Sequence, residues 1–200
     1  MAGPENDTSL ADYEVLLCVT GGIACYKSAD LASKLVGCGA GVSVAMTEAA
    51  IKFIAPVTFQ ALTLRPVFSS MWVNPEDYRA DHIALTEKAD LMIVAPATAN
   101  VLAKFATGIA DDLISTMYLA ASGTCPLLVA PAMNTRMWNA PPVQANIQRL
   151  REWGVQFIGP AEGKLACRTV GMGRMSEPAD ILAAAKTILL ARPPKKVGKG

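Results

Sequence analysis

The sequence lacks the residues from which metal sites are usually built. It contains one histidine, His82, and five cysteines, no two of which form a CxxC motif. A zinc-type site needs several histidine or cysteine ligands at short spacing, so we expect no metal centre. The odd number of cysteines and the lack of a signal-peptide pattern at the N-terminus favour free thiols in a reducing, cytoplasmic setting.

Charge imbalance and long apolar runs are lacking as well. The net charge is +1, aromatic residues make up 6%, and no basic stripe is present, which disfavours a nucleic-acid partner. No apolar run reaches about 18 residues, so no membrane span is predicted. What is present is apolar material, 52% of 200 residues, enough for one well-packed domain. We expect that domain at residues 13–192, between a disordered N-terminal arm (1–12) and a disordered tail (193–200).

Short apolar runs alternate with helical patterns along the chain. The runs are unbroken, which is typical of parallel strands covered on both faces. They predict strands at residues 15–19, 42–46, 91–95, 127–130 and 155–158. Helices are predicted at residues 24–36, 48–64 (split at Pro56), 83–89, 101–106, 112–121, 143–153 and 179–191, the first of them capped by Gly37. This alternation predicts an α/β fold, a Rossmann-like (flavodoxin-like) doubly wound parallel sheet in a single domain.

Small and hydrogen-bonding residues follow four of the predicted strands, at positions 20–22, 47–48, 96–100 and 131–134. In such a sheet, ligands bind beyond the carboxyl ends of the strands. Gly21 and Gly22 let the backbone approach a ligand at the start of a helix, where an anion is favoured. The segment is neither GxGxxG nor a P-loop, so it favours a mononucleotide. A tight turn without a ligand explains the glycine pair equally well.

The other loops have structural interpretations too. Thr47 can cap a helix or hold a phosphate, and Thr98 or Asn100 can cap the next helix or bind a heterocycle. The segment APAMNTRMW (130–138) is more unusual, because it combines an amide, a guanidinium, two thioethers and an indole. Asn134 can bind a carboxylate or an amide, and Arg136 can bind an anion. Packing of the methionines and the tryptophan alone does not explain the whole segment.

These segments resemble the homo-oligomeric flavin-containing cysteine decarboxylases, especially the branch that acts in coenzyme A biosynthesis. The matching segments cover nearly all of residues 14–188. They are VTGGIACYKSADL (19–31), MTEAAIKFIAP (46–56), TFQAL (58–62), DHIALTEKADLMIVAPATAN (81–100), GIADDL (108–113), APAMNTRMW (130–138) and GKLACRTVGMGRM (163–175). The PAMNTRMW string, with a lone histidine upstream and a cysteine segment downstream, is the most specific part of this resemblance.

The resemblance implies FMN as the cofactor and assigns roles to individual residues. The residues matched to cofactor binding are Gly21, Gly22, Ile23, Thr47, Phe59, Thr98, Ala99, Asn100, Val101 and Ala132. Those matched to substrate binding are Asn134, Lys164, Ala166 and Met137. His82 and Cys167 match the catalytic pair, and the remaining cysteines are expected to be structural. Arg168 departs from the family, which has glycine directly after the cysteine; a glycine there would permit a positive φ and a close approach of the backbone.

The activity implied is the FMN-dependent decarboxylation of 4'-phosphopantothenoylcysteine to 4'-phosphopantetheine, through a thioaldehyde and an enethiolate. Asn134 would orient the carboxylate, His82 would accept or relay the thiol proton, and Cys167 would protonate the enethiolate. The resemblance also implies a homo-oligomer, a trimer or a dodecamer of trimers, and a separate ligase that supplies the substrate. Two alternatives stay open: a peptidyl-cysteine decarboxylase of peptide-antibiotic maturation, and a regulatory flavoprotein without catalysis.

Overall fold

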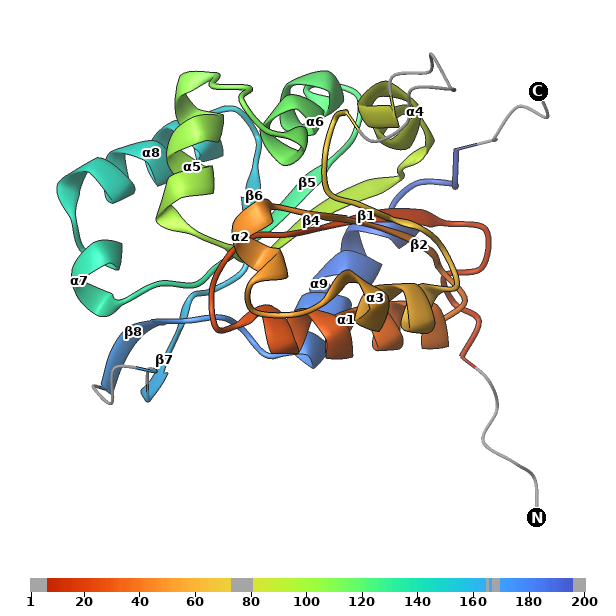
Figure 1. Cartoon of the computed structure of the whole chain (residues 1–200), viewed down its shortest axis with the longest axis horizontal. Coiled ribbons are helices and arrows are strands. Elements are labelled where there is room, and N and C mark those ends of the chain that lie inside the picture. Colours follow the sequence, from red (N-terminus) through yellow and green to blue (C-terminus); the bar gives the residue numbers. More distant parts are fainter. Residues whose placement is uncertain (1–6, 73–80, 165, 167–169, 196–200) are drawn as a thin grey trace.

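The computed structural model describes residues 7–72, 81–164, 166 and 170–195. Figure 1 shows one central sheet with helices on both faces and a small separate hairpin near the edge of the molecule. The strands of the central sheet are β1 (Glu14–Val19), β2 (Gly41–Met46), β3 (Val67–Phe68), β4 (Leu91–Ala97), β5 (Leu127–Pro131) and β6 (Gln156–Phe157). The hairpin consists of β7 (Ala161–Lys164) and β8 (Val170–Arg174). No described helix is long and apolar enough to cross a membrane.

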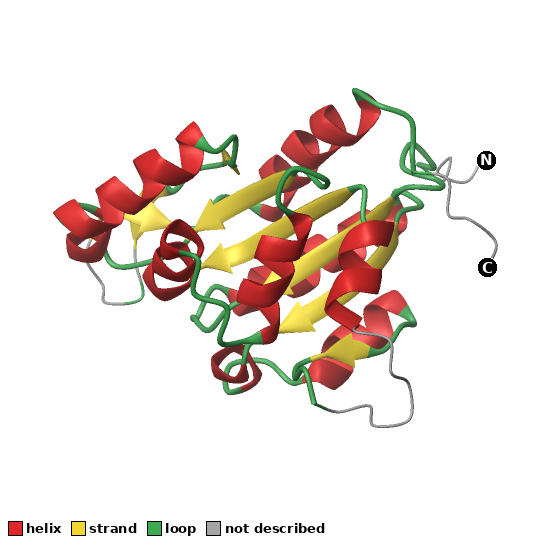
Figure 2. Cartoon of the chain, turned by 90° about the horizontal axis from the view of Figure 1, so that it is seen from above, coloured by secondary structure: helices red, strands yellow, loops and turns green. Residues whose placement is uncertain are grey.

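The six strands of the central sheet lie in the order β3-β2-β1-β4-β5-β6. Every pair of neighbours is parallel, so all carboxyl ends lie at one edge, as Figure 2 shows. The chain runs outward from β1 to β3 and then returns to place β4 beside β1. The strand order therefore reverses between β1 and β4, where a doubly wound sheet opens a crevice for ligands. The predicted Rossmann-like fold is confirmed.

The helices cover the two faces of this sheet in separate groups (Figure 1). Their bounds are α1 (Cys25–Gly37), α2 (Glu48–Ile51), α3 (Pro56–Thr63), α4 (Asp81–Lys88), α5 (Ala99–Thr107), α6 (Leu113–Ala121), α7 (Thr135–Trp138), α8 (Pro141–Glu152) and α9 (Pro178–Leu190). Leu31, Phe59 and Ile181 bury α1, α3 and α9 against one face. Phe105 and Ile147 help to bury α5 and α8 against the other. The inner strands β1, β4 and β5 are mostly apolar and buried because both of their faces are covered.

The predicted elements are all present, with shifted ends. The interpretation of Gly37 as a cap is wrong: Gly37 is the last residue of α1, and the left-handed residue is Gly39, with φ of 87°. The Gly39 amide donates to Val36 O and satisfies an end carbonyl of the helix. Pro56 is the first residue of α3, as the predicted split requires, because proline suits that position.

Four elements were not predicted. β3 has two residues, α7 has four, and the β7–β8 hairpin carries glycines and exposed side chains. None of them has an apolar run long enough to produce a periodic signal. β6 is also shorter than the predicted strand at residues 155–158.

The described parts of the two expected disordered termini pack on the fold. Leu10 is fully buried, its amide donates to Cys38 O at 2.9 Å, and Asp7 pairs with Lys186 at 2.6 Å. At the other end, the Lys195 amide donates to Asp90 Oδ1 at 2.6 Å. The prediction of a disordered arm is therefore wrong for residues 7–12, where the buried Leu10 and the Asp7–Lys186 ion pair tie the chain to the fold.

Candidate functional site

Two cavities lie at the carboxyl ends of the parallel strands. The first has a volume of about 490 Å³ and includes Gly21 in its wall. The second has a volume of about 790 Å³ and includes Gly22. The glycine pair after β1 thus contributes one residue to each cavity. Both volumes lie in the range of small-molecule and cofactor sites.

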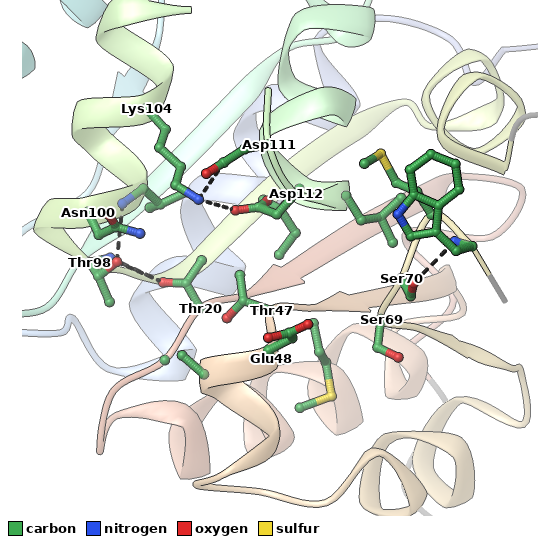
Figure 3. A pocket seen from close by; sticks show the side chains of 18 residues that line it. Thr20, Thr47, Glu48, Ser69, Ser70, Thr98, Asn100, Lys104, Asp111 and Asp112 are labelled. Atoms are coloured by element: carbon green, nitrogen blue, oxygen red, sulfur yellow. Dashed lines mark hydrogen bonds and ion pairs between the residues drawn. The ribbon is translucent and has the colours of Figure 1, made fainter. Parts of the chain in front are cut away.

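The first cavity collects the loops after β1, β2 and β4 (Figure 3). The predicted cofactor residues in its wall are Gly21, Thr47, Thr98, Asn100 and Val101. Thr47 caps α2 by accepting the Ala50 amide at 3.2 Å, and Thr98 caps α5 by accepting the Val101 amide at 3.3 Å. A hydroxyl that accepts in a cap still has its own proton to donate. The capping interpretation and the ligand-binding interpretation of these threonines are therefore compatible.

Gly21 is required by close packing. A Cβ atom at this position would lie 2.4 Å from Ala49 Cβ and 2.8 Å from the Ala49 carbonyl carbon. Any side chain would therefore push the loop after β1 away from the start of α2. At Gly22 a Cβ would meet nothing within 4 Å. Close packing therefore requires glycine at position 21 but not at position 22.

Thr20, which follows the first predicted strand but was assigned no contact with a ligand, joins the two central loops. Its hydroxyl donates to Pro96 O at 2.6 Å and accepts the Thr98 amide at 3.2 Å. The side chain is 1% exposed. This pair of bonds fixes the end of β1 against the end of β4, at the point where the strand order reverses. A threonine directly after a buried strand was the available signal, and only the topology showed its partner.

Replacing Thr20 by valine should destabilise the protein and weaken flavin binding. Valine has nearly the same shape but leaves Pro96 O and the Thr98 amide without their partner. The loss of a buried hydroxyl partner costs about 1–3 kcal/mol in the free energy of unfolding. Urea denaturation and flavin titration measure the two effects. Thr187→Val is the matched control, because its exposed hydroxyl bonds only to Ala183 O within α9; equal effects of both changes would contradict the prediction.

A cluster of charged side chains forms part of the wall of the first cavity. This cluster was not predicted from the sequence. Figure 3 shows Lys104 between Asp111 and Asp112, with both contacts at 2.6 Å. Burial alone would raise the pKa of Asp112, but the bonds from Lys104 and the Ser115 amide lower it below its usual value. Asp112 is therefore ionised at neutral pH and caps α6. The GIADDL segment contains both aspartates, but their partner Lys104 lies on another helix, α5.

The second cavity collects the loop after β5, the start of α1 and the hairpin. The predicted residues in its wall are Gly22, Ile23, Ala132, Asn134, Lys164 and Ala166. Asn134 caps α7, since its Oδ1 accepts the Arg136 amide at 2.8 Å. The neighbouring Met133 amide donates to Gly173 O of β8 at 2.9 Å. A Cβ at Gly173 would lie 2.2 Å from Met133 O, so glycine allows the hairpin to pack directly on this loop.

A buried lysine connects α1 to the segment that follows the hairpin. Lys27 is 7% exposed, and its Nζ donates to Met175 O at 3.1 Å and to Glu177 Oε1 at 2.9 Å. The bond from Lys27 holds the pKa of the Glu177 carboxyl below its usual value. Arg174 NH1 also approaches Glu177 Oε1, at 3.2 Å. These three side chains line the second cavity and were not predicted as site residues.

The other predicted site residues are Phe59, Ala99, Met137, His82 and Cys167. Phe59 is fully buried in the core, Ala99 begins α5, and Met137 is 48% exposed on α7; none of the three lines either cavity. His82 lies in the first turn of α4, and its side chain is outside the described part of the structure. Cys167 and Arg168 are also outside the described residues. Their assigned roles stay predictions.

The four described cysteines are free and buried. They are Cys18, Cys25, Cys38 and Cys125. Burial raises the pKa of each thiol, most strongly at Cys18. A thiol with a raised pKa is a poor nucleophile, which fits the structural role predicted for these residues. Within the described ranges, no group of three or more histidine, cysteine or acidic residues is placed to hold a metal ion.

Comparison with known proteins relates the whole domain to flavin-dependent decarboxylases. The flavoprotein family model matches residues 4–189. The bifunctional coenzyme A biosynthesis protein CoaBC of Bacillus subtilis is 50% identical over 88% of this chain, and the chain spans 43% of its length. A probable phosphopantothenoylcysteine decarboxylase of Streptococcus mutans is 43% identical over 82% of this chain and 92% of its own.

Solved structures give the same relationship. A PPC decarboxylase mutant complexed with pantothenoylaminoethenethiol has a TM-score of 0.78 at 32% identity, over 88% of this chain and 97% of its own. The FMN-dependent cysteine decarboxylase SpaF also has a TM-score of 0.78 at 32% identity, over 90% of this chain and 97% of its own. The chain therefore belongs to the flavoprotein family, among the phosphopantothenoylcysteine decarboxylases and related flavin-dependent cysteine decarboxylases.

Proposed function

We propose that this chain binds FMN and decarboxylates 4'-phosphopantothenoylcysteine to 4'-phosphopantetheine, a step of coenzyme A biosynthesis. The observation that carries the proposal is the pair of cavities that Gly21 and Gly22 line at the sheet edge. The first is lined by hydroxyl, amide and charged side chains, and the second contains Asn134 and basic side chains. The relatives that share this fold are decarboxylases of cysteine-derived substrates by name.

The residues present fit FMN. The predicted cofactor residues divide between the two cavities, so the proposed FMN lies across the Gly21–Gly22 junction. The backbone of residues 21–23 and the Thr47 hydroxyl would hold the phosphate at the start of α1, where the helix dipole favours an anion. Thr98 and Asn100 offer hydrogen bonds to the flavin. No protein atom lies within 4 Å of a Cβ added at Gly22, so packing within the chain does not require glycine there. A glycine at this position fits a backbone that approaches a ligand closely.

The chain's own residues would orient the substrate and move protons. When bound, FMN supplies a two-electron acceptor and donor, so the reaction needs no external reductant. Asn134 would bind the carboxylate and fix its orientation, because its amide lines the second cavity. His82 would take the thiol proton. Cys167 would deliver the proton to the enethiolate after loss of CO2.

Measurement of CO2 release tests this function directly. The purified protein should absorb as an oxidised flavoprotein and should release CO2 from 4'-phosphopantothenoylcysteine, with 4'-phosphopantetheine as the product. A peptide with a C-terminal cysteine tests the alternative function, that of a peptidyl-cysteine decarboxylase. Release of CO2 from the peptide alone would overturn the proposed substrate. Bound flavin without release from either compound would favour a regulatory flavoprotein instead.

We also propose that the chain forms a homo-oligomer, with a trimer as the expected unit. Apolar side chains near the cavities are exposed in the single chain, among them Ile23 at 61% and Tyr26 at 64%. Exposed apolar patches on a soluble protein commonly mark interfaces. Light scattering or native mass measurement on the flavin-loaded protein gives the number of subunits, and a monomer would contradict this proposal.

A further inference from the structure

The two cavities carry charge of opposite sign. Of the described residues that line the first cavity, Lys104 is basic, whereas Glu48, Asp111 and Asp112 are acidic. In the second cavity the basic residues are Lys27, Lys164 and Arg174, and the acidic one is Glu177. Three cations against one carboxylate leave a surplus of two positive charges in the wall of the second cavity. Such a wall favours a dianionic group on the molecule that it binds.

The cations of the second cavity are not equivalent. Lys27 is buried, and both of its hydrogen bonds stay inside the protein, to Met175 O and Glu177. Arg174 is different, because its side chain is 42% exposed and only NH1 contacts Glu177. Its Nε is buried and has no hydrogen-bond partner among the described residues. A guanidinium has five N–H donors, so Arg174 keeps several of them for an anion.

The position of Arg174 is fixed from two sides. Glu177, which Lys27 holds, contacts one end of the guanidinium. On the other side, a Cβ at Gly163 of β7 would lie 3.0 Å from Arg174 Nε, so the side chain lies close against that strand. A guanidinium held in this way loses little freedom when it binds, which strengthens recognition.

Arg174 also lies close to the residue proposed to bind the substrate carboxylate. The preceding residue, Gly173, accepts a hydrogen bond from Met133, and the residue after Met133 is Asn134. Asn134 and Arg174 therefore line the same cavity from adjoining segments. One molecule in this cavity can meet a neutral amide and a guanidinium at once.

We propose that Arg174 recognises the phosphate of the substrate and so sets the preference for the phosphorylated compound. This inference rests on the proposed function, which gives the substrate a carboxylate and a phosphate. The guanidinium fork matches phosphate with two parallel hydrogen bonds, and the surplus charge of the cavity matches the dianion. Lys27 and Glu177 act on the phosphate only through the position they give to Arg174.

The test compares two substrates that differ by the phosphate alone, 4'-phosphopantothenoylcysteine and pantothenoylcysteine. In Arg174→Gln, kcat/KM for the phosphorylated compound should fall at least tenfold, mainly through KM. For pantothenoylcysteine it should change less than twofold. Arg174→Lys keeps the positive charge but loses the forked guanidinium. Its kcat/KM for the phosphorylated compound should lie between those of Arg174→Gln and the unmodified protein. Flavin absorbance and the melting temperature establish that each variant is folded.

Arg192→Gln is the matched control for the loss of one positive charge. Arg192 follows the C-terminal end of α9, whereas Arg174 precedes its start, about 20 Å away along a helix of 13 residues. Arg192→Gln should leave the ratio of the two kcat/KM values unchanged. Equal losses for both substrates in Arg174→Gln, or no loss for either, would overturn the role of Arg174 while CO2 release still supports the proposed function. The lack of CO2 release from both substrates with the unmodified protein would overturn both proposals.

Discussion

We expect His82→Asn to abolish CO2 release while the protein keeps its flavin. The proposed role of His82 is proton transfer from the substrate thiol, which contributes about 10²–10⁴-fold to a rate. Asparagine has a similar size and can still form hydrogen bonds, but its amide does not titrate near neutral pH. His82 is the one histidine in the sequence. The loss should therefore appear in kcat rather than in the binding of flavin or substrate.

The measurement is a CO2-release assay over a pH series, with flavin absorbance and melting temperature recorded on the same samples. A folded, yellow His82→Asn protein with nearly unchanged kcat would refute the catalytic role. A colourless variant would place His82 in cofactor binding instead. His82 lies in the first turn of α4, where the backbone is helical.

The second large effect is expected at Gly21. Replacement by valine places a branched side chain where even a Cβ would lie 2.4 Å from Ala49 Cβ and 2.8 Å from its backbone. Backbone atoms cannot rotate away as a flexible side chain can, so the loop after β1 must move. Overpacking of this kind costs about 1–3 kcal/mol or more. Because the same loop forms the wall of the first cavity, the variant should also lose flavin.

Denaturation curves and the ratio of flavin to protein measure the two consequences of Gly21→Val. Gly37→Ala is the matched control for a change at glycine. Gly37 ends α1, and its added Cβ would meet nothing within 4 Å. Alanine is favoured over glycine in a helix by about 0.5–1 kcal/mol, so this control should be neutral or slightly stabilising. If Gly21→Val remained as stable and as yellow as the Gly37→Ala protein, the close-packing explanation would be wrong.

Local patterns predicted the framework of the fold. The unbroken apolar runs gave four of the long strands because a strand covered on both faces must be apolar along its whole length. The predicted helices were found with ends shifted by a few residues. The helix ends shifted because a cap depends on the backbone angles of single residues. At the end of α1, for example, the left-handed glycine is Gly39 and not the predicted Gly37. The short elements that were missed, such as β3 and the hairpin, have neither a long apolar run nor a periodic pattern to detect.

The candidate site was predicted where its residues follow strands. Gly21, Thr47, Thr98 and Asn134 were found in this way, because parallel strands bring their carboxyl ends to one edge. Charged partners could not be found by the same logic. Lys104 lies on α5 and its aspartates precede α6, while Lys27 on α1 meets Glu177 about 150 residues later. Such pairs form only when distant segments pack together.

The sequence by itself determined the fold class, the edge of the sheet at which the two cavities lie and, through its resemblance to flavin-containing cysteine decarboxylases, the expected chemistry. Each of these follows from local residue types and their order along the chain. Only the tertiary structure decided that the glycine pair faces two cavities, and that these cavities differ in charge. Both depend on which distant loops and helices meet, and long-range packing of this kind leaves no periodic mark in a sequence. The role proposed for Arg174 rests on that packing together with the proposed function.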